Sequence, residues 1–455
     1  MVQTKALHRL GSVVRGVNPS VLLFISAIIA IIFANSPLRD IYFSFLDSPV
    51  NVTIGSYNLF SHHGHAMSLQ DFVNDALMAI FFFVIGLEIK KEIMIGELSS
   101  MRKALLPIIA AIGGMVVPVL FFLLVSHESP AMRGAAIPMA TDIAFALAVL
   151  SLLGKRVPIA LKIFLTALAV VDDIGGILVI AIFYTSHIAW TPLLLGLGLL
   201  VLCYFLGRKG LDKAYIYYLI GFFVWTLFLS SGVHTTISGV LLALTIPAKA
   251  TVKLPDLMAS MKYMVSKFEP TYEGDTTNSD FISHGKLIAL RKMEKRVERT
   301  ISPVQFMEHD LHPIVNYFIL PLFAFVNSGV TFGGITLGEL AGVPLAVFLG
   351  LFFGKMIGVF GFTYIFLRLG VVRLPAGVTR NNLFGVSIFG GIGFTVSLFI
   401  ANLSYGPLGE IGAALLNQAK IGVFVGTFVS GVFGYFYLSK VLKKEERIRS
   451  THLKY

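Results

Sequence analysis

Long apolar segments recur along the whole chain, and they constrain its fold more than any other feature. A helix needs about 20 apolar residues to cross the roughly 30 Å hydrocarbon core of a bilayer. Helices and closed barrels are the only structures that satisfy every backbone polar group there, and segments of this length predict helices. The twelve candidate segments lie near residues 18–35, 70–95, 104–126, 130–153, 157–185, 190–207, 214–230, 232–247, 311–331, 341–368, 382–404 and 412–439.

Composition agrees with a membrane protein that crosses the bilayer many times. Only 13% of the 455 residues are charged, and the mean hydropathy is +0.82, whereas a soluble domain carries about 25% charged residues. This balance excludes a disordered tail, a disulfide scaffold and an ordinary cytosolic enzyme. A single cysteine, Cys203, allows no intrachain disulfide. We therefore predict an all-α polytopic membrane protein with twelve transmembrane helices.

The net charge of +11 would suggest nucleic-acid binding in a soluble protein. When the segments alternate across a bilayer, however, 32 of the 36 basic residues fall on one side. Short loops keep their Lys and Arg in the cytoplasm, so both termini are predicted to be cytoplasmic. The positive charge is then a signal of orientation, and no nucleic-acid partner is expected.

This topology divides the chain into a cytoplasmic arm (1–17), one twelve-helix domain (18–440) and a cytoplasmic tail (441–455). Two longer connections interrupt the domain. The external connection, 45–69, alternates in polarity over Val50–Ile54 and Tyr57–Phe60 around Gly55-Ser56, which predicts a β-hairpin. The cytoplasmic loop, 248–307, carries Leu290, Met293, Val297 and Ile301 among basic residues, consistent with an amphipathic surface helix or a solvated regulatory arm.

Two of the predicted spans are interrupted. The fourth contains Ala136-Ile-Pro-Met-Ala-Thr-Asp142, and the eleventh contains Gly390-Gly-Ile-Gly393. Each is the middle member of a triple, spans 3–5 and spans 10–12, and the two triples have opposite predicted topology. Such inverted repeats with interrupted spans are typical of the binding sites of secondary transporters. Glycines that merely let helices pack closely are the alternative.

Antiparallel crossing of these interrupted spans would bring like helix ends together. Each end carries about half an elementary charge, positive at the N-terminus and negative at the C-terminus. Asp142 would compensate the positive ends, and Lys355 could reach the negative ends. Thr141 could offer its hydroxyl to a cation or bond its own backbone.

Charges in the middle of the spans are the strongest pointers to function. Each costs about 2.5–3.5 kcal/mol at the bilayer centre, so Asp142, Asp172, Asp173 and Lys355 need compensation. Adjacent helical residues point about 100° apart, so one of Asp172 and Asp173 can pair with Lys355 while the other faces a cavity. A dehydrated carboxylate binds protons and hard cations such as Na⁺ or Li⁺ in competition, which predicts exchange. A buried ion pair that only fixes helix packing is the alternative.

Together these residues resemble the NhaA-type sodium/proton antiporter family of bacteria. The resemblance covers the chain from about Asn18 to the end of the twelfth span. The motifs that carry it are Ala140-Thr-Asp142-Ile-Ala-Phe-Ala, Val171-Asp-Asp173-Ile-Gly, Gly86-Leu-Glu88 with Lys91-Glu92, Ser231-Gly-Val-His234, Leu320-Pro-Leu-Phe-Ala-Phe, Gly354-Lys355 and Gly391-Ile-Gly-Phe-Thr395.

The resemblance implies exchange of Na⁺ or Li⁺ for H⁺ by alternating access in the bacterial inner membrane, without a cofactor. It implies that the exchange is electrogenic and pH-regulated, serves pH and sodium homeostasis, and occurs in a homodimer joined by the external hairpin. Asp173 would be the principal carboxylate for cation and proton, beside Asp172 paired to Lys355, with Asp142 and Thr141 at the crossing. The positions that match pH regulation are Glu88, Lys91, Glu92, Glu308, His309 and His312.

Other classes remain as alternatives. A membrane-embedded, metal-dependent transferase would use adjacent carboxylates for Mg²⁺, but it would place them near the membrane surface. A retinal protein would use Lys355 as a Schiff base and would show a visible absorption band. A cation channel, or another cation transporter, would differ from an antiporter in its coupling to protons.

Overall fold

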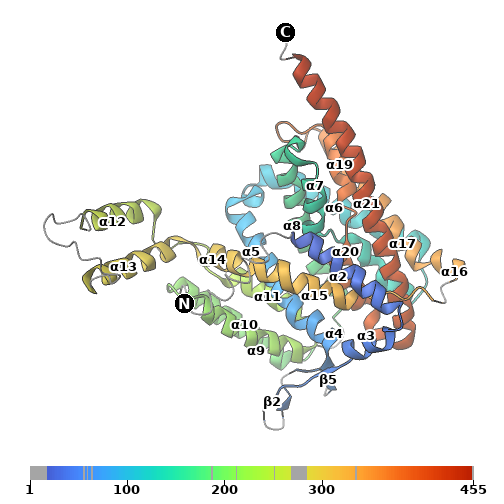
Figure 1. Ribbon diagram of the computed structural model, residues 1–455, viewed down its shortest axis with the longest axis horizontal. Helices are drawn as coiled ribbons and strands as arrows, with labels where there is room; N and C mark the ends of the chain where they lie inside the picture. The colour runs from blue at the N-terminus through green and yellow to red at the C-terminus, as the bar shows by residue number, and fades with distance from the viewer. Residues whose placement is uncertain are drawn as a thin grey trace.

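The computed structural model describes residues 18–54, 57–58, 60–62, 65–185, 188–211, 213–250, 252–267, 284–333 and 336–452. The described chain is mostly helical, and a few short strands lie at one end of the helical body (Figure 1). The predicted arm over 1–17 lies outside the described residues. The mainly helical fold class is confirmed.

The helices follow one another closely along the chain. In the first half they are α2 (Pro19–Ala34), α3 (Arg39–Leu46), α4 (Leu69–Phe72), α5 (Met78–Ile95), α6 (Met101–Val125), α7 (Ile143–Ser151), α8 (Ile159–Phe183), α9 (Trp190–Arg208), α10 (Ala214–Ser231) and α11 (Thr235–Thr245). In the second half they are α12 (Leu254–Lys267), α13 (His284–Thr300), α14 (Pro303–Ile314), α15 (Leu320–Asn327), α16 (Leu337–Leu340), α17 (Val343–Leu349), α18 (Lys355–Arg368), α19 (Arg380–Phe389), α20 (Phe394–Tyr405) and α21 (Gly409–His452).

Seven further turns have 3₁₀ or π geometry. Three π-helical turns join α-helices without a break, and four segments are 3₁₀. The π turns are η1 (Val73–Leu77), η5 (Val315–Ile319) and η6 (Gly350–Gly354), and the 3₁₀ segments are η2 (Glu97–Ser99), η3 (Ala131–Met139), η4 (Gly154–Arg156) and η7 (Gly406–Leu408).

Every one of the twelve predicted segments contains helix. Within the described residues, seven helices are long and apolar enough to cross a membrane, and nine if each of two bent pairs counts as one span. The bent pairs are α2 with α3, at 117°, and η3 with α7, at 44°. Helix α11 is apolar but only 11 residues long. The twelve-span count therefore stays a prediction.

Helix starts follow the local sequence. The side chain of Asn18 accepts from the backbone N–H of Ser20 and Pro19 occupies the first turn of α2, while Ser302 and Pro303 repeat this arrangement at α14. Proline fits the first turn because its missing N–H would have no helical partner there. The predicted ninth span thus begins within a continuous helical segment that starts at Pro303 rather than near residue 311.

Glycines let two helices cross closely in the core. Helices α6 and α18 pack against each other, and a Cβ built on Gly358 would lie 2.7 Å from the carbonyl carbon of Gly113. One turn earlier, a Cβ on Gly354 would lie 2.6 Å from the Cα of Pro118. Small residues that let backbones approach are the usual means of packing helices in membranes. This crossing fixes where Lys355, the residue after Gly354, meets its neighbours.

The predicted hairpin is present. Strand β2 (Thr53–Ile54) pairs antiparallel with β3 (Tyr57–Asn58), with Ile54 opposite Tyr57. A second sheet has the order β1-β5-β4, built from β1 (Pro49–Val50), β4 (Ser61–His62) and β5 (His65–Ser68). Ser68 then forms a capping box with Asp71 at the start of α4, which leads the chain from the strands straight into helix.

Two regions differ from the sequence expectation. The loop predicted over 248–307 contains α12 as well as the expected helix, which is α13, and the two helices extend side by side away from the helical body (Figure 1). The predicted tail over 441–455 continues α21 as far as His452. At 1.5 Å per residue α21 is about 66 Å long, far longer than the hydrocarbon core, and Figure 1 shows its end standing clear of the other helices.

Candidate functional site

Two chain interruptions meet in the middle of the helical body. One separates η3 from α7 at residues 140–142, and the other separates α19 from α20 at residues 390–393. The backbone N–H of Asp142 donates to the carbonyl of Ile392 at 2.6 Å. Backbone groups that leave the helical ladder need partners elsewhere, and here the second interruption supplies one to the first.

Asp142 caps both of the helices that begin at this meeting point. Its Oδ1 accepts from the backbone N–H of Phe145 at 3.0 Å, in the first turn of α7. Its Oδ2 accepts from the backbone N–H and the hydroxyl of Thr395, at 3.1 and 2.6 Å, at the start of α20. A buried carboxylate between two helix N-termini balances their positive ends. The structure thus places Asp142 where the sequence argument located the positive ends.

Lys355 lies against Asp172. The lysine is fully buried and Asp172 is 2% exposed, and Nζ donates to Oδ2 of Asp172. The ideal Cβ of Gly114 would lie 3.5 Å from this Nζ, so a glycine on α6 makes room for the ammonium group. The structure therefore brings Lys355 to a carboxylate on α8. The same side chain passes the negative end of α19, as predicted, because a Cβ built on Gly390 would lie 3.9 Å from its Cδ.

Thr141 links this pair to the second interruption. Its Oγ1 lies 2.8 Å from Oδ2 of Asp172 and 2.9 Å from the carbonyl oxygen of Gly390. A hydroxyl has one hydrogen, so it donates to one of these acceptors at a time. The other oxygen of Asp172, Oδ1, is buried and has no hydrogen-bond partner in the described part of the chain. A buried acceptor left open is one that a proton or a cation can use.

Asp173 faces a different environment from Asp172. It is 5% exposed and lines a cavity of about 370 Å³, which we call the α14-side cavity. Thr141, Asp142 and Thr395 line the same cavity near Asp173. The predicted regulatory residues that also line it are Glu88, Lys91, Glu92, Glu308 and His312.

One ion pair and one histidine–carboxylate contact connect α5 and α14 across this cavity. Nζ of Lys91 lies 2.8 Å from Oε1 of Glu308, and Nε2 of His312 lies 3.6 Å from Oε1 of Glu88. Glu92 instead accepts from the backbone N–H of Glu97 at 2.9 Å, beyond the end of its own helix.

His309 belongs to the same stretch of α14 but takes no part in this lining. It is exposed, and it is absent from the described residues around the α14-side cavity. The structure therefore gathers five of the six predicted regulatory side chains and leaves His309 outside the group.

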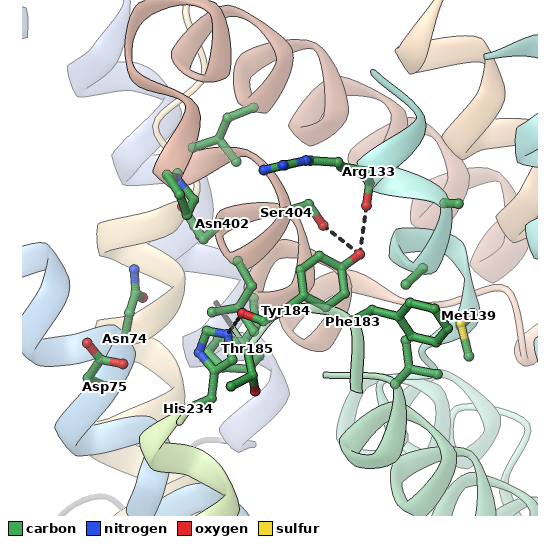
Figure 2. A pocket seen from close by; sticks show the side chains of 18 of the residues that line it. Asn74, Asp75, Arg133, Met139, Phe183, Tyr184, Thr185, His234, Asn402 and Ser404 are labelled. Carbon is green, nitrogen blue, oxygen red and sulfur yellow. Dashed lines mark hydrogen bonds between the residues drawn. The ribbon is translucent and has the colours of Figure 1, made fainter. Parts of the chain in front are cut away.

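A second, larger cavity of about 1600 Å³ opens on the side of the strands, and we call it the hairpin-side cavity. Figure 2 shows Asn74 and Asp75 on one wall and Tyr184 near its centre. The hydroxyl of Tyr184 donates to the carbonyl of Arg133 at 2.7 Å and accepts from the hydroxyl of Ser404 at 3.0 Å (Figure 2). The cavity extends inward to Met139 and Gly175, close to the aspartate pair.

Sequence reasoning missed a chain of amides beside this cavity. Asn327 is fully buried, its Nδ2 donates to Oδ1 of Asn74 at 2.7 Å, and its Oδ1 accepts from Asn402 at 2.8 Å. The signal available in the sequence was an asparagine inside an otherwise apolar segment. Thr395, quoted only as part of a motif, is likewise a direct partner of Asp142.

The donor set around the aspartate pair is rich in oxygen atoms. Among the described residues no group of three or more His, Cys, Asp and Glu side chains is arranged to hold a metal ion. Carboxylate, hydroxyl and backbone carbonyl oxygens do gather around Asp172 and Asp173. Hard cations prefer such ligands, so the arrangement suits a transient alkali cation.

Comparison with known proteins identifies the family. The model of the Na⁺/H⁺ antiporter 1 family matches residues 14–438. Proteins named Na(+)/H(+) antiporter NhaA are 55% identical to this chain in Parabacteroides distasonis, 52% in Porphyromonas gingivalis and 50% in Bacteroides fragilis. These alignments cover 94% of this chain and 94–96% of each relative. The chain therefore belongs to the Na⁺/H⁺ antiporter 1 family, and it is a secondary transporter and not an enzyme.

Proposed function

We propose that this protein exchanges Na⁺ or Li⁺ for H⁺ across the bacterial cytoplasmic membrane by alternating access. The observation that carries the proposal is the environment of two adjacent buried carboxylates. Asp172 is held by Lys355, while Asp173 lies open to the α14-side cavity. Relatives at 50–55% identity bear the name Na(+)/H(+) antiporter, which supports the same ions here.

The proposed topology has twelve spans and two inverted triples, spans 3–5 and 10–12. The two interruptions that meet at Asp142 and Ile392 support this arrangement, because interrupted spans of transporters meet near the bilayer centre. The bias of basic residues puts both termini, and the mouth of the α14-side cavity, in the cytoplasm. The hairpin-side cavity then faces the outside.

Competition for one set of oxygens couples the two ions in this proposal. Asp173 and Asp172 hold either protons or a dehydrated cation, and Thr141 turns its hydroxyl hydrogen to Gly390 so that its oxygen can join the cation's ligands. A cation drawn to Asp172 also competes with Lys355 for Oδ2. With more than one titratable group in the site, more than one proton can leave per cation, and transport is electrogenic.

The residues at the mouth of the α14-side cavity supply pH regulation in this proposal. Glu88, Lys91, Glu308 and His312 join α5 to α14 by charged contacts, and a histidine among them changes charge near neutral pH. Glu92 and the exposed His309 act at its edge. The hairpin of β2 and β3 projects from the end of the helical body (Figure 1), which supports a homodimer joined through it, embedded in membrane lipid and serving pH and sodium homeostasis.

A sodium pulse to everted membrane vesicles that hold a pH gradient tests the proposal. A proton-sensitive dye should report alkalinisation of the interior when Na⁺ or Li⁺ is added, and Asp173→Asn should reduce the initial rate at least tenfold, the factor for about 1.4 kcal/mol of lost binding. Glu410→Gln, on an exposed turn at the start of α21, is the matched carboxylate control. No dye response in the unaltered protein at any pH from about 6.5 to 9, a range around the histidine transition, would refute exchange. Full activity in Asp173→Asn would refute the site.

A further inference from the structure

The two cavities approach each other closely at the aspartate pair. On α8, Asp173 lines the α14-side cavity and Gly175 lines the hairpin-side cavity. Two residues rise about 3 Å along a helix axis. On the interrupted span, Thr141 and Met139 divide in the same way, with Thr141 on the α14 side and Met139 on the hairpin side. A thin layer of side chains therefore separates the site from the hairpin-side cavity.

Met115 on α6 is part of that layer. A Cβ built on Gly175 would overlap the Sδ of Met115 and would lie 2.9 Å from its Cε. The side chain of Met115 therefore rests in the space that any larger residue at position 175 would fill. Among the residues that the structure describes, none comes within 4 Å of a Cβ built on the next residue, Gly176. Within this part of the chain, a neighbouring side chain therefore rests on Gly175 and not on Gly176.

The position of Met115 also links it to the ion pair. Gly114, the preceding residue on α6, faces the ammonium group of Lys355. Gly175 is three residues after Asp172 on α8, and residues at this spacing share one face of a helix. Met115 thus lies on the hairpin side of the Asp172–Lys355 pair, where α6 packs against α8. Met139, 6% exposed, belongs to the apolar cluster against which Met115 packs.

We propose that Met115, resting on Gly175, is the gate that closes the hairpin-side cavity from the aspartate pair. This inference rests on the alternating-access function proposed above. The thioether has three rotatable bonds and adapts its shape readily, so it can leave Gly175 without a change in the backbone. An apolar layer of this kind stops an ion because the ion cannot keep its water shell there. When the layer opens, the carboxylates exchange their ion with the hairpin side.

The test compares Gly175→Ala with Gly176→Ala in the full-length protein reconstituted in proteoliposomes. The same methyl group displaces Met115 in the first variant and meets open space in the second. Two fluxes are measured together: entry of radioactive Na⁺ and the accompanying proton movement, from a pH-sensitive dye. We expect Gly175→Ala to raise the Na⁺ moved per H⁺ roughly tenfold, the flux change for a barrier lowered by about 1.4 kcal/mol, and Gly176→Ala to keep the ratio of the unaltered protein.

Changes at Met115 complete the design. Met115→Ala removes the side chain and should give a similar uncoupled Na⁺ flux. Met115→Leu, of similar volume, should keep the coupling ratio of the unaltered protein. Adding Gly175→Ala to Met115→Ala should change nothing further, because the two residues act through one contact. Size-exclusion profiles in detergent identify any variant that fails to fold. Met115→Ala keeps the test valid if Gly175→Ala does not fold, because it opens the layer by removing atoms.

The outcomes separate the gate from the transport function. A coupling ratio in Gly175→Ala equal to that in Gly176→Ala, or an equal fall in both fluxes, would overturn the gate. A reconstituted, unaltered protein that moves no protons in response to Na⁺ would overturn the proposed exchange itself.

Discussion

The two faces of α8 around Asp172 and Asp173 carry the same chemical group in opposite settings. On one face Asp172 is enclosed by Lys355 and Thr141. On the other face Asp173 opens to a cavity whose far wall carries Glu88 and His312. The helix turns about 100° between the two residues, and that rotation alone separates them. The contrast teaches that environment alone can give neighbouring carboxylates different partners, here a buried ammonium group for one and a cavity for the other.

The largest expected effect concerns stability. Removing one member of a buried ion pair leaves the other as an unpaired buried charge, at a cost of about 3–5 kcal/mol. Asp172→Asn should therefore lower the thermal unfolding temperature in detergent strongly, because Lys355 loses its partner. Asp173→Asn should leave it near that of the unaltered protein. Asp172→Asn combined with Lys355→Met should recover most of the loss. Equal unfolding temperatures for the two single variants would break the comparison.

A middle-sized effect is expected at Asp142, which lines the cavity beside Asp173 but is itself held by hydrogen bonds. Asp142→Ala removes the cap of both α7 and α20, and each lost cap costs about 1 kcal/mol. The midpoint of thermal unfolding should fall by roughly twice as much as in Thr395→Val, which removes only the hydroxyl partner. An equal fall in the two variants would mean that the two backbone caps add nothing measurable beyond the Thr395 hydroxyl contact.

The smallest effect is expected at the mouth of the α14-side cavity. His312 faces Glu88 at 3.6 Å and Asn316 at 2.7 Å, with the Lys91–Glu308 pair beside it. Protonation of His312 as the pH falls adds a positive charge to the path of a cation, so exchange should weaken toward acid pH. His312→Asn removes this charge, and its activity below neutral pH should exceed that of the unaltered protein a few-fold.

The measurement for His312 is the pH profile of dye-reported exchange at saturating and at low Na⁺. Asn keeps a polar group next to Asn316, and His284→Asn, at the exposed start of α13, is the matched control. A profile of His312→Asn that overlays that of His284→Asn would remove His312 from regulation.

Much of the site could be predicted from the sequence because its signals are local. Two aspartates in mid-span, a proline-containing break and a glycine-rich break each stand out within a few residues. The length of the apolar segments was likewise a local signal, and all twelve predicted segments contain helix. Charged residues in such segments are costly, so few occur, and each is conspicuous.

What sequence could not predict depends on contacts between distant segments. The amides of Asn74, Asn327 and Asn402 come from three helices, and nothing in any one segment indicates that they join. The pairing of Met115 with Gly175 is of the same kind. Helix α12 was missed because its apolar residues are spread within a loop of mixed polarity. The continuation of α21 beyond residue 440 was missed because charged residues favour helix as readily as coil.

The π turn η6, directly before Lys355, helps to fix the direction in which this lysine points. A π turn holds one residue more than the α-helix needs, so everything after it is rotated by about 100° relative to an uninterrupted helix. Lys355 meets Asp172 with that extra residue taken up inside the π turn. Deleting a single residue from Gly350–Gly354 would let the turn return to α-helical spacing and keep the ammonium group toward Asp172. Adding a single residue there would rotate the rest of the helix by about 100° and point the ammonium group at a different neighbour. The spacing of this helix, as much as the identity of its lysine, thus decides whether the Asp172–Lys355 contact forms.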